Sequence, residues 1–172
     1  CRFNISVMEK NMEKGIHLLV ITRDKKIMEN LLSLVQQRDN TFSLSLSKTV
    51  SGSLMKKIMN NVPDAILLDC VKDKSDAVDN LNKFHDQGIT APVIILSGLG
   101  SEAAAVSLMQ AGAADYLPRG ILFDGSDSAP LISAITRAMD REKSKQEKKR
   151  KLIALELSEE RYRVLIEHSP VL

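Results

Sequence analysis

Residues 63–75 read PDAILLDCVKDKS, and they contain an apolar run, Ala65 to Leu68, that stops at Asp69. Four consecutive apolar residues after Pro63 predict a short, buried strand. A carboxylate at the end of such a strand is costly to bury unless another group pairs with it or a reaction uses it. Asp69 is therefore the first candidate functional residue.

The same pattern recurs along the first 140 residues, where strand-length apolar runs alternate with segments of helical periodicity. The expected strands are IHLLVIT (16–22), TFSLSLS (41–47), the run before Asp69, PVIILSG (92–98) and ADYLPRG (114–120). The expected helices are 25–37, 51–62, 75–89, 101–112 and a long one that starts at Ser128 and Pro130. Strands that are apolar on both faces indicate a parallel sheet covered on both sides. The sequence thus predicts an α/β fold with a doubly wound five-stranded parallel sheet and an extended C-terminal helix.

Polar residues cluster where the predicted strands end. Such sheets carry their working residues at the carboxyl ends of the strands. Asp69 ends one strand, Ser97 ends the next along the chain, and Thr22, Arg23 and Asp24 follow the first. We expect these side chains to share one edge of the sheet.

Composition narrows the class of protein. The chain has 172 residues, 44% apolar and 3% aromatic, with 24 basic and 22 acidic side chains. This balance argues against a nucleic-acid partner, and no apolar run is long enough to span a membrane. Cys1 and Cys70 have no disulfide-framework spacing, so we expect a cytoplasmic protein. Residues 1–15 are expected to be an N-terminal lead that is partly not native sequence.

The last predicted helix continues beyond the α/β part. Residues 140–151, DREKSKQEKKRK, contain no apolar side chain, and a helix that is polar all round is solvent-bridging. The basic run KKRK would suit a nucleic-acid or membrane surface, but acidic neighbours and the lack of aromatic residues favour a solvated face. We therefore expect residues 140–160 to be a charged helical linker.

The segments HLLVITRDKK, PDAILLDC, APVIILSG and AGAADYLPRG resemble the strand ends of response-regulator receiver domains of two-component signalling. The resemblance covers residues 16–139 and implies a flavodoxin-like sheet with strand order 2-1-3-4-5. The tail LSEERYRVLIEHSP resembles the helical lead-in to a PAS sensor domain. Residues 161–172 are therefore expected to be the truncated start of such a domain.

The resemblance assigns a role to each residue of the site. Asp69 matches the phosphoacceptor, Ser97 the hydroxyl that contacts the phosphoryl group, and Gly98 the small residue beside it. Tyr116 matches the aromatic side chain that swings inward on activation, and Arg119 stands where the family has lysine. These residues would bind a phosphoryl group and change conformation in response.

The site departs from the family where the family has two adjacent acidic residues that help to hold Mg²⁺. Thr22 and Arg23 occupy these positions, and Asp24 falls one position late. The implied Mg²⁺ ligands are Asp69 and, less well supported, Asp24 and the backbone of Val71. A guanidinium near a carboxylate attracts it by about 4 kcal/mol at an effective dielectric of about 20. We expect an Arg23–Asp69 pair to take the place of the metal.

Three functions remain open at this point. The first is a receiver domain that a histidine kinase or phosphotransfer protein phosphorylates at Asp69. Its last helix would pass the phosphorylation state or the geometry of a homodimer to downstream PAS and output domains. The output domain would be a histidine kinase or a cyclic-di-GMP enzyme. No independent catalysis is expected of this chain. The second is a pseudo-receiver that acts as an interaction or dimerisation module without phosphorylation.

The third function is a nucleotide-binding enzyme. GLGSEA (98–103) fits the dinucleotide fingerprint G-x-G-x-x-G/A through Gly98, Gly100 and Ala103. The motif lies in the fourth strand–helix unit instead of the first, and Asp115 begins a strand where the fingerprint needs an acid at a strand end. This function is the weakest of the three.

Overall fold

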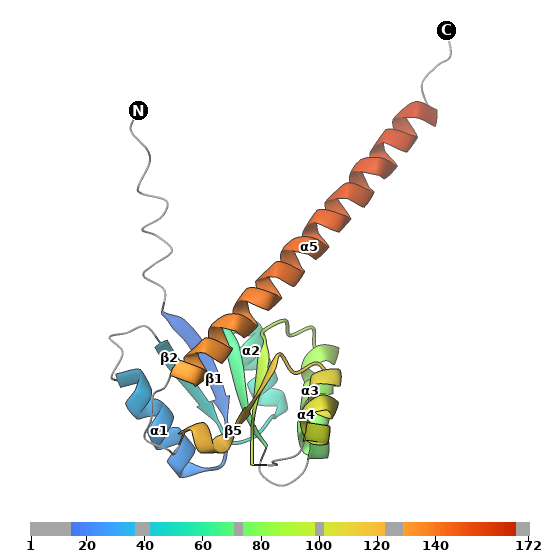
Figure 1. Cartoon of the computed structure of the whole chain (residues 1–172). Helices are drawn as coiled ribbons and strands as arrows, with labels where there is room; N and C mark the ends of the chain where they lie inside the picture. The colour runs from blue at the N-terminus through green and yellow to red at the C-terminus, as the bar shows by residue number, and fades with distance from the viewer. Residues whose placement is uncertain (1–14, 37–41, 71–73, 99–101, 123–128, 168–172) are drawn as a thin grey trace, which may run out of the picture. The chain divides into compact units, whose positions relative to one another are not determined.

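The computed structural model describes residues 15–36, 42–70, 74–98, 102–122 and 129–167, in which strands and helices alternate (Figure 1). The strands are β1 (Ile16–Ile21), β2 (Phe42–Ser47), β3 (Ala65–Cys70), β4 (Val93–Ser97) and β5 (Asp115–Pro118). The helices are α1 (Lys25–Gln36), α2 (Gly52–Asn60), α3 (Lys74–Asp86), α4 (Glu102–Gln110), the 3-10 turn η3 (Arg119–Leu122) and α5 (Ala129–Glu167). The predicted alternation is confirmed.

The five strands form one parallel sheet in the order β2-β1-β3-β4-β5. The predicted sheet, its strand order and the extended last helix are thus confirmed. β3 is the central strand, and Asp69 near its end lies opposite Leu96 of β4. This register brings the carboxyl ends of β1, β3 and β4 to one edge of the sheet.

Two apolar cores cover the two faces of the sheet, because successive side chains of a strand point to opposite faces. Ile66 and Leu68 of β3 belong to the core that includes α2 and α3. Ala65 and Leu67 belong to the core that includes α1 and the first turns of α5. By the same alternation, Asp69 continues the row of Leu67.

The chain divides into two compact units, Cys1–Met139 and Asp140–Leu172. In the first unit, α5 contributes Leu131, Ala134 and Ile135 to the core on the α1 side of the sheet. The predicted helix start at Pro130 is found in the first turn of α5, whereas Ser128 lies outside the described residues.

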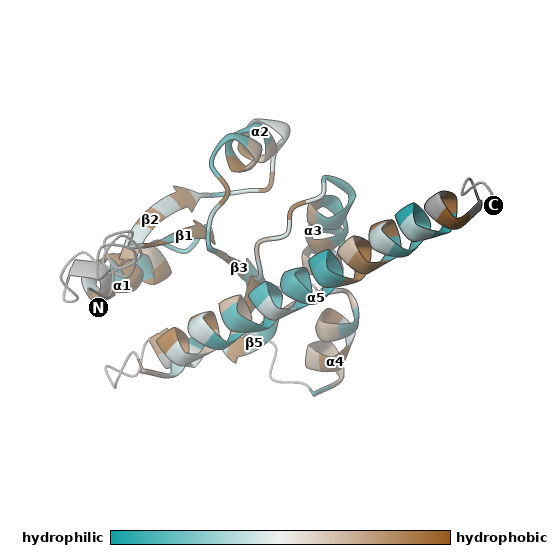
Figure 2. Cartoon of the chain, turned by 90° about the horizontal axis from the view of Figure 1, so that it is seen from above, coloured by the Kyte–Doolittle hydropathy of each residue, from teal (hydrophilic) through white to brown (hydrophobic). Residues whose placement is uncertain are grey.

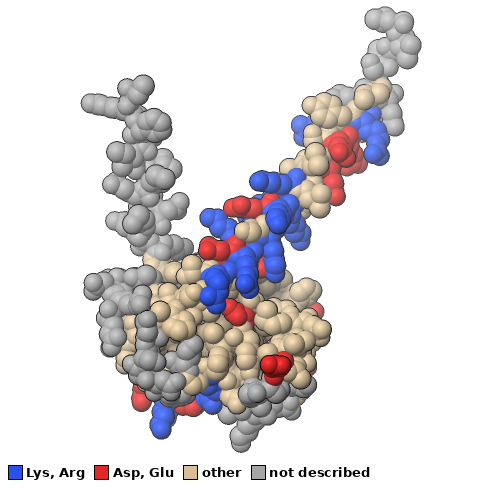
Figure 3. Space-filling model, viewed as in Figure 1, with Lys and Arg blue, Asp and Glu red and all other residues tan. Residues whose placement is uncertain are grey.

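The part of α5 in the second unit is mostly exposed. Its residues 140–151 carry seven basic and three acidic side chains, which Figure 3 shows crowded along the helix. More apolar turns follow (Figure 2), with Leu152, Leu155 and Leu157 each more than half exposed. No helix of the described ranges combines the length and the apolar character that a membrane crossing needs.

Candidate functional site

Asp69 is the centre of a polar cluster at the carboxyl edge of the sheet. Its side chain is only 1% exposed. The Thr22 hydroxyl, at the end of β1, donates a hydrogen bond of 2.6 Å to Asp69 Oδ2 and accepts one of 3.0 Å from the Asp24 backbone N–H. Thr22 is itself buried. The turn after β1 is therefore tied directly to the buried carboxylate.

Arg119 binds both carboxylates of the cluster. Its Nη2 lies 2.7 Å from Asp24 Oδ2, and its Nε lies 2.9 Å from Asp69 Oδ1. Nη2 also donates a longer hydrogen bond of 3.4 Å to Asp69 Oδ2. The Arg119 side chain is 17% exposed and that of Asp24 is 33% exposed, so water reaches the outer pair more easily than Asp69. Arg119 starts η3, directly after β5, and so connects the carboxyl ends of β1, β3 and β5.

The two carboxylates differ in their electrostatics. Burial raises the pKa of Asp69, while the Thr22 hydrogen bond and the Arg119 charge oppose this shift. The pKa of Asp24 is lowered, chiefly by the hydrogen bond that its Oδ1 accepts from the Lys26 backbone N–H, and also by Arg119. Asp24 is thus the more readily ionised of the two acids, and Asp69 is the carboxylate whose charge depends on its partners.

The contact between Arg119 Nε and Asp69 Oδ1 has an ion-pair distance but not a hydrogen-bond alignment. Both atoms are buried and form no hydrogen bond with the described residues. A metal ion could use such an oxygen, and Mg²⁺ needs one or two carboxylates. However, the guanidinium lies within contact of both Asp24 and Asp69, and no cluster of three or more metal-ligating side chains occurs among the described residues. As arranged, these residues do not fit Mg²⁺; Val71, its predicted backbone ligand, lies outside the described ranges.

The predicted Arg23–Asp69 pair is wrong, because the cation beside Asp69 is Arg119. Thr22 and Arg23 are consecutive, and consecutive side chains at a strand end point in different directions. Thr22 is turned toward Asp69, whereas Arg23 is exposed. Asp24, one position late in the sequence, nevertheless joins the cluster through Arg119.

The remaining predicted site residues surround this cluster at different distances. Ser97 is buried, and it lies opposite Cys70 of β3 and Pro118 of β5. A Cβ atom placed on Gly98 would lie 3.5 Å from Arg119 Cδ, so Gly98 borders the guanidinium stem. Tyr116 is partly buried against the core on the α3 side of the sheet. Gly98 thus lies close to Arg119, while Tyr116 packs against the core on the α3 side of the sheet.

A hollow of about 580 Å³ lies at the carboxyl edge of the sheet. It borders Asp69 and is lined on its rim by both basic and acidic side chains. The charged residues are Arg23, Lys48, Lys83, Asp76 and Asp79. Because the Asp69 side chain is only 1% exposed, a small phosphodonor or a side chain of a partner protein would reach the carboxylate from this hollow only after neighbouring side chains move.

The nucleotide fingerprint has a different environment. Gly98 follows β4, where an added Cβ would meet Arg119, Ala103 lies in α4, and Gly100 lies outside the described residues. Asp115 begins β5, as the sequence predicts, and forms a 3.4 Å ion pair with Arg137. The nucleotide-binding function therefore stays a prediction.

Comparison with known proteins gives relatives by sequence. No protein-family model matches the chain. It is 29% identical over 104 residues to the response regulator MprA of a Mycobacterium species (strain KMS), covering 60% of this chain and 44% of the relative. It is 30% identical over 119 residues to a protein-glutamate methylesterase/protein-glutamine glutaminase of Treponema denticola, covering 67% of this chain and 31% of the relative. The chain thus spans less than half the length of these curated relatives.

Solved structures give the same fold. The receiver domain of the Francisella response regulator 1452 has a TM-score of 0.59 and 24% identity, and the match covers 74% of this chain and 98% of that domain. The beryllofluoride-activated NtrC4 receiver domain dimer has a TM-score of 0.60 and 21% identity, covering 73% and 98%. Both matches extend over nearly the whole of the other domain.

Proposed function

We propose that this chain, which carries the receiver domain of two-component systems, accepts a phosphoryl group on Asp69. The observation that supports this most directly is the buried Asp69 carboxylate, held by Thr22 and Arg119 at the carboxyl edge of the sheet, where the residue borders a hollow of about 580 Å³. A buried acid with a shifted pKa, beside a cation and a cavity, is typical of a functional site. Response-regulator receiver domains interact with histidine kinases and phosphotransfer proteins, which are the proposed donors.

The proposed chemistry is a single group transfer. An oxygen of the ionised Asp69 attacks the phosphorus of the donor, a phosphorus–oxygen bond forms, and the bond from phosphorus to the leaving atom breaks. The leaving group keeps the electron pair, and the product is an acyl phosphate. Arg119 and the Thr22 hydroxyl keep Asp69 anionic before the reaction, and Arg119 can then contact the phosphoryl oxygens. Receiver domains generally bind Mg²⁺ at this site, but no step here is assigned to it because Arg119 lies between the carboxylates.

The response to phosphorylation is proposed to start at Arg119. The phosphoryl group adds nearly two negative charges, which compete with Asp24 for the guanidinium. Ser97 and Gly98 lie at the carboxyl end of β4, beside β3, and Tyr116 packs against the core on the α3 side of the sheet. We propose that Ser97 contacts the phosphoryl group and that Tyr116 moves when Arg119 is redirected.

A second candidate is a pseudo-receiver that acts without phosphorylation. The observation in its favour is the same guanidinium, which contacts Asp24 at 2.7 Å and Asp69 at 2.9 Å and so occupies the place of a bridging cation. In this case Asp69 serves as an internal ion-pair partner. The domain then acts through its shape and its surfaces.

One experiment separates the two candidates. The chain is incubated with acetyl phosphate or phosphoramidate, with and without Mg²⁺, and its intact mass is measured. We expect the mass of one phosphoryl group to be added, and Asp69→Asn to prevent it. If the native chain gains no mass under any condition while Arg119→Lys does, the phosphoacceptor proposal is wrong and the pseudo-receiver is supported.

The extended helix is proposed to link the receiver to other parts of a cytoplasmic signalling protein. In this proposal residues 16–139 are the receiver, 140–160 the charged linker and 161–172 the start of a PAS domain. The exposed Leu152, Leu155 and Tyr162 would pair with a second copy. Light scattering after size exclusion, with and without beryllofluoride, tests the dimer, and a monomer in both states would contradict it.

A further inference from the structure

One face of the edge strand β2 is made of hydroxyl groups. Phe42 and Leu44 point to one side, where Leu44 packs against the core on the α1 side. Ser43, Ser45 and Ser47 alternate with them and face the side of α2. In a sheet covered by helices on both faces, strands are usually apolar on both faces. The serine face therefore indicates that α2 does not seal this side of β2.

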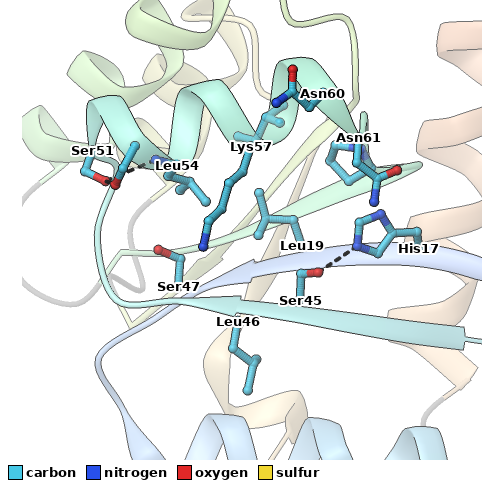
Figure 4. Close-up of a pocket in the computed structure, with 13 residues that line it drawn as sticks. His17, Leu19, Ser45, Leu46, Ser47, Ser51, Leu54, Lys57, Asn60 and Asn61 are labelled. Atoms are coloured by element: carbon cyan, nitrogen blue, oxygen red, sulfur yellow. Dashed lines mark hydrogen bonds between the residues drawn. The ribbon is translucent and has the colours of Figure 1, made fainter.

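The space between β2 and α2 is an open cavity of about 520 Å³ (Figure 4). This volume is within the usual range of about 300–1,000 Å³ for small-molecule sites. β1 contributes His17, β2 contributes Ser45 and Ser47, and α2 contributes Lys57, with Asn61 directly after the helix. None of the described residues that line this cavity also lines the hollow beside Asp69, so the two are separate sites.

The charged and polar groups of this cavity favour an anion. Lys57 extends from α2 toward β2, with its ammonium group near Ser47 (Figure 4). It forms no ion pair with the described residues, and no carboxylate occurs among the described residues that line the cavity. A cation without a carboxylate partner, surrounded by hydroxyl and amide groups, matches a ligand with one anionic group and several hydroxyls.

Local hydrogen bonds hold the polar wall in place. His17 Nε2 lies 2.8 Å from Ser45 Oγ, and the Ser47 hydroxyl donates a 3.0 Å bond to the Thr49 carbonyl. The His17 backbone is fixed by two bonds with Asp64, one of 2.7 Å from its N–H to Oδ2 and one of 2.8 Å from the Asp64 N–H to its carbonyl. Because these groups are already positioned, binding would cost little reorganisation.

We propose that this cavity binds a small hydroxylated organic anion, such as a sugar phosphate or a hydroxycarboxylic acid. Lys57 pairs with the anionic group, and Ser45, His17 and Asn61 hydrogen-bond to the hydroxyls. The site is independent of Asp69 phosphorylation, so a failure of either proposal leaves the other standing.

The test uses the full chain, labelled with ¹⁵N, and two probes, D-glucose 6-phosphate and citrate. We expect saturable shifts of the backbone amide signals of Ser45, Ser47 and Asn61, and no such shifts with uncharged D-glucose. If neither anion gives saturable shifts there, or if D-glucose binds equally well, the proposal is wrong. An outcome in which only one anion binds identifies the ligand class as phosphate ester or carboxylic acid.

Two matched pairs of variants locate the binding. Lys57→Met should weaken the binding of the anion about tenfold or more, whereas Lys56→Met, on the same helix but outside the cavity lining, should not. Ser45→Ala should weaken it more than Ser43→Ala, which changes the same face of β2 outside the lining. Equal effects of Lys57→Met and Lys56→Met would show only a general effect of charge and would overturn the proposal. The amide spectra of the free variants report whether each one is folded.

Discussion

Replacing Arg119 by methionine tests whether this cation compensates the buried charge of Asp69. Methionine keeps most of the apolar stem and removes the guanidinium, so packing changes little. Asp69, with a side chain that is 1% exposed, would then keep, among the described residues, only the Thr22 hydroxyl as a partner. We expect the free energy of unfolding at neutral pH to fall.

The expected loss is set by the burial of the two partners. Breaking a buried ion pair by removing one partner costs about 3–5 kcal/mol. The pair here is less enclosed on the side of Arg119, which is 17% exposed. We therefore expect a loss of about 2–3 kcal/mol, at or below the lower limit of that range. With a urea dependence of about 1–3 kcal/mol per M, the midpoint of unfolding should fall by about 0.7–3 M.

The loss should depend on pH in a defined direction. The pKa of Asp69 is already raised by burial, and removing Arg119 raises it further. When the pKa of a carboxyl is higher in the folded state than in the unfolded state, the fold loses stability as the pH rises from the unfolded-state pKa to the folded-state pKa. Below the unfolded-state pKa the carboxyl is protonated in both states and this loss is absent. The difference between the wild type and Arg119→Met should therefore be small in acid below the ordinary aspartate pKa of 3.8 and grow toward neutrality.

Urea unfolding followed by circular dichroism at a series of pH values measures this difference. Asp69→Asn should remove most of the cost, so the double variant should be more stable than Arg119→Met alone at neutral pH. Arg23→Met is the matched control, because Arg23 is exposed, and it should change stability by less than about 0.5 kcal/mol. A cost that is equal at all pH values, or that survives in the double variant, would refute the compensation of Asp69 by Arg119.

Three further changes test other contacts by the same unfolding measurement. Thr22→Val removes the 2.6 Å hydrogen bond to Asp69 and should lower the free energy of unfolding by about 1–3 kcal/mol. Thr49→Val, at an exposed position, should lower it little, and equal losses in the two variants would contradict the role of the Thr22 hydroxyl. Ile94→Ala, at a fully buried position of the central sheet, should cost about 2–5 kcal/mol, and a smaller loss would mean that the core refills the space. Ser51→Ala removes the side-chain cap of α2 and should cost about 1 kcal/mol, with no loss expected if the bond to Leu54 is not formed in solution.

The sheet could be predicted because its strands carry their signal locally. β3 and β4 are apolar on both faces and end at polar residues, and this pattern distinguishes a covered parallel strand from an amphipathic one. The position of Asp69 at the carboxyl edge followed from the pattern as well. The strand order came from the resemblance to the receiver family, since periodicity alone does not fix it.

The partner of Asp69 could not be predicted from sequence neighbours. Arg23 is close to Thr22 in the chain but exposed in the structure, whereas Arg119 comes from another loop and reaches both acids. Which cation fills a site depends on side-chain direction at the strand ends, and a one-residue change reverses that direction. The cavity beside Lys57 was missed for a similar reason, although the serines of β2 were a visible signal.

The contacts of Arg119 also bear on how the domain folds and unfolds. Arg119 is 50 positions from Asp69 and 95 from Asp24, and it follows β5, a four-residue strand that pairs only with β4 among the described strands. Because the contacts join segments far apart in the sequence, we expect them to form late in folding, after β1, β3 and β5 have docked. Interactions formed after the transition state slow unfolding without accelerating folding. We therefore expect Arg119 to determine how long the folded sheet persists and to have little effect on how fast it forms.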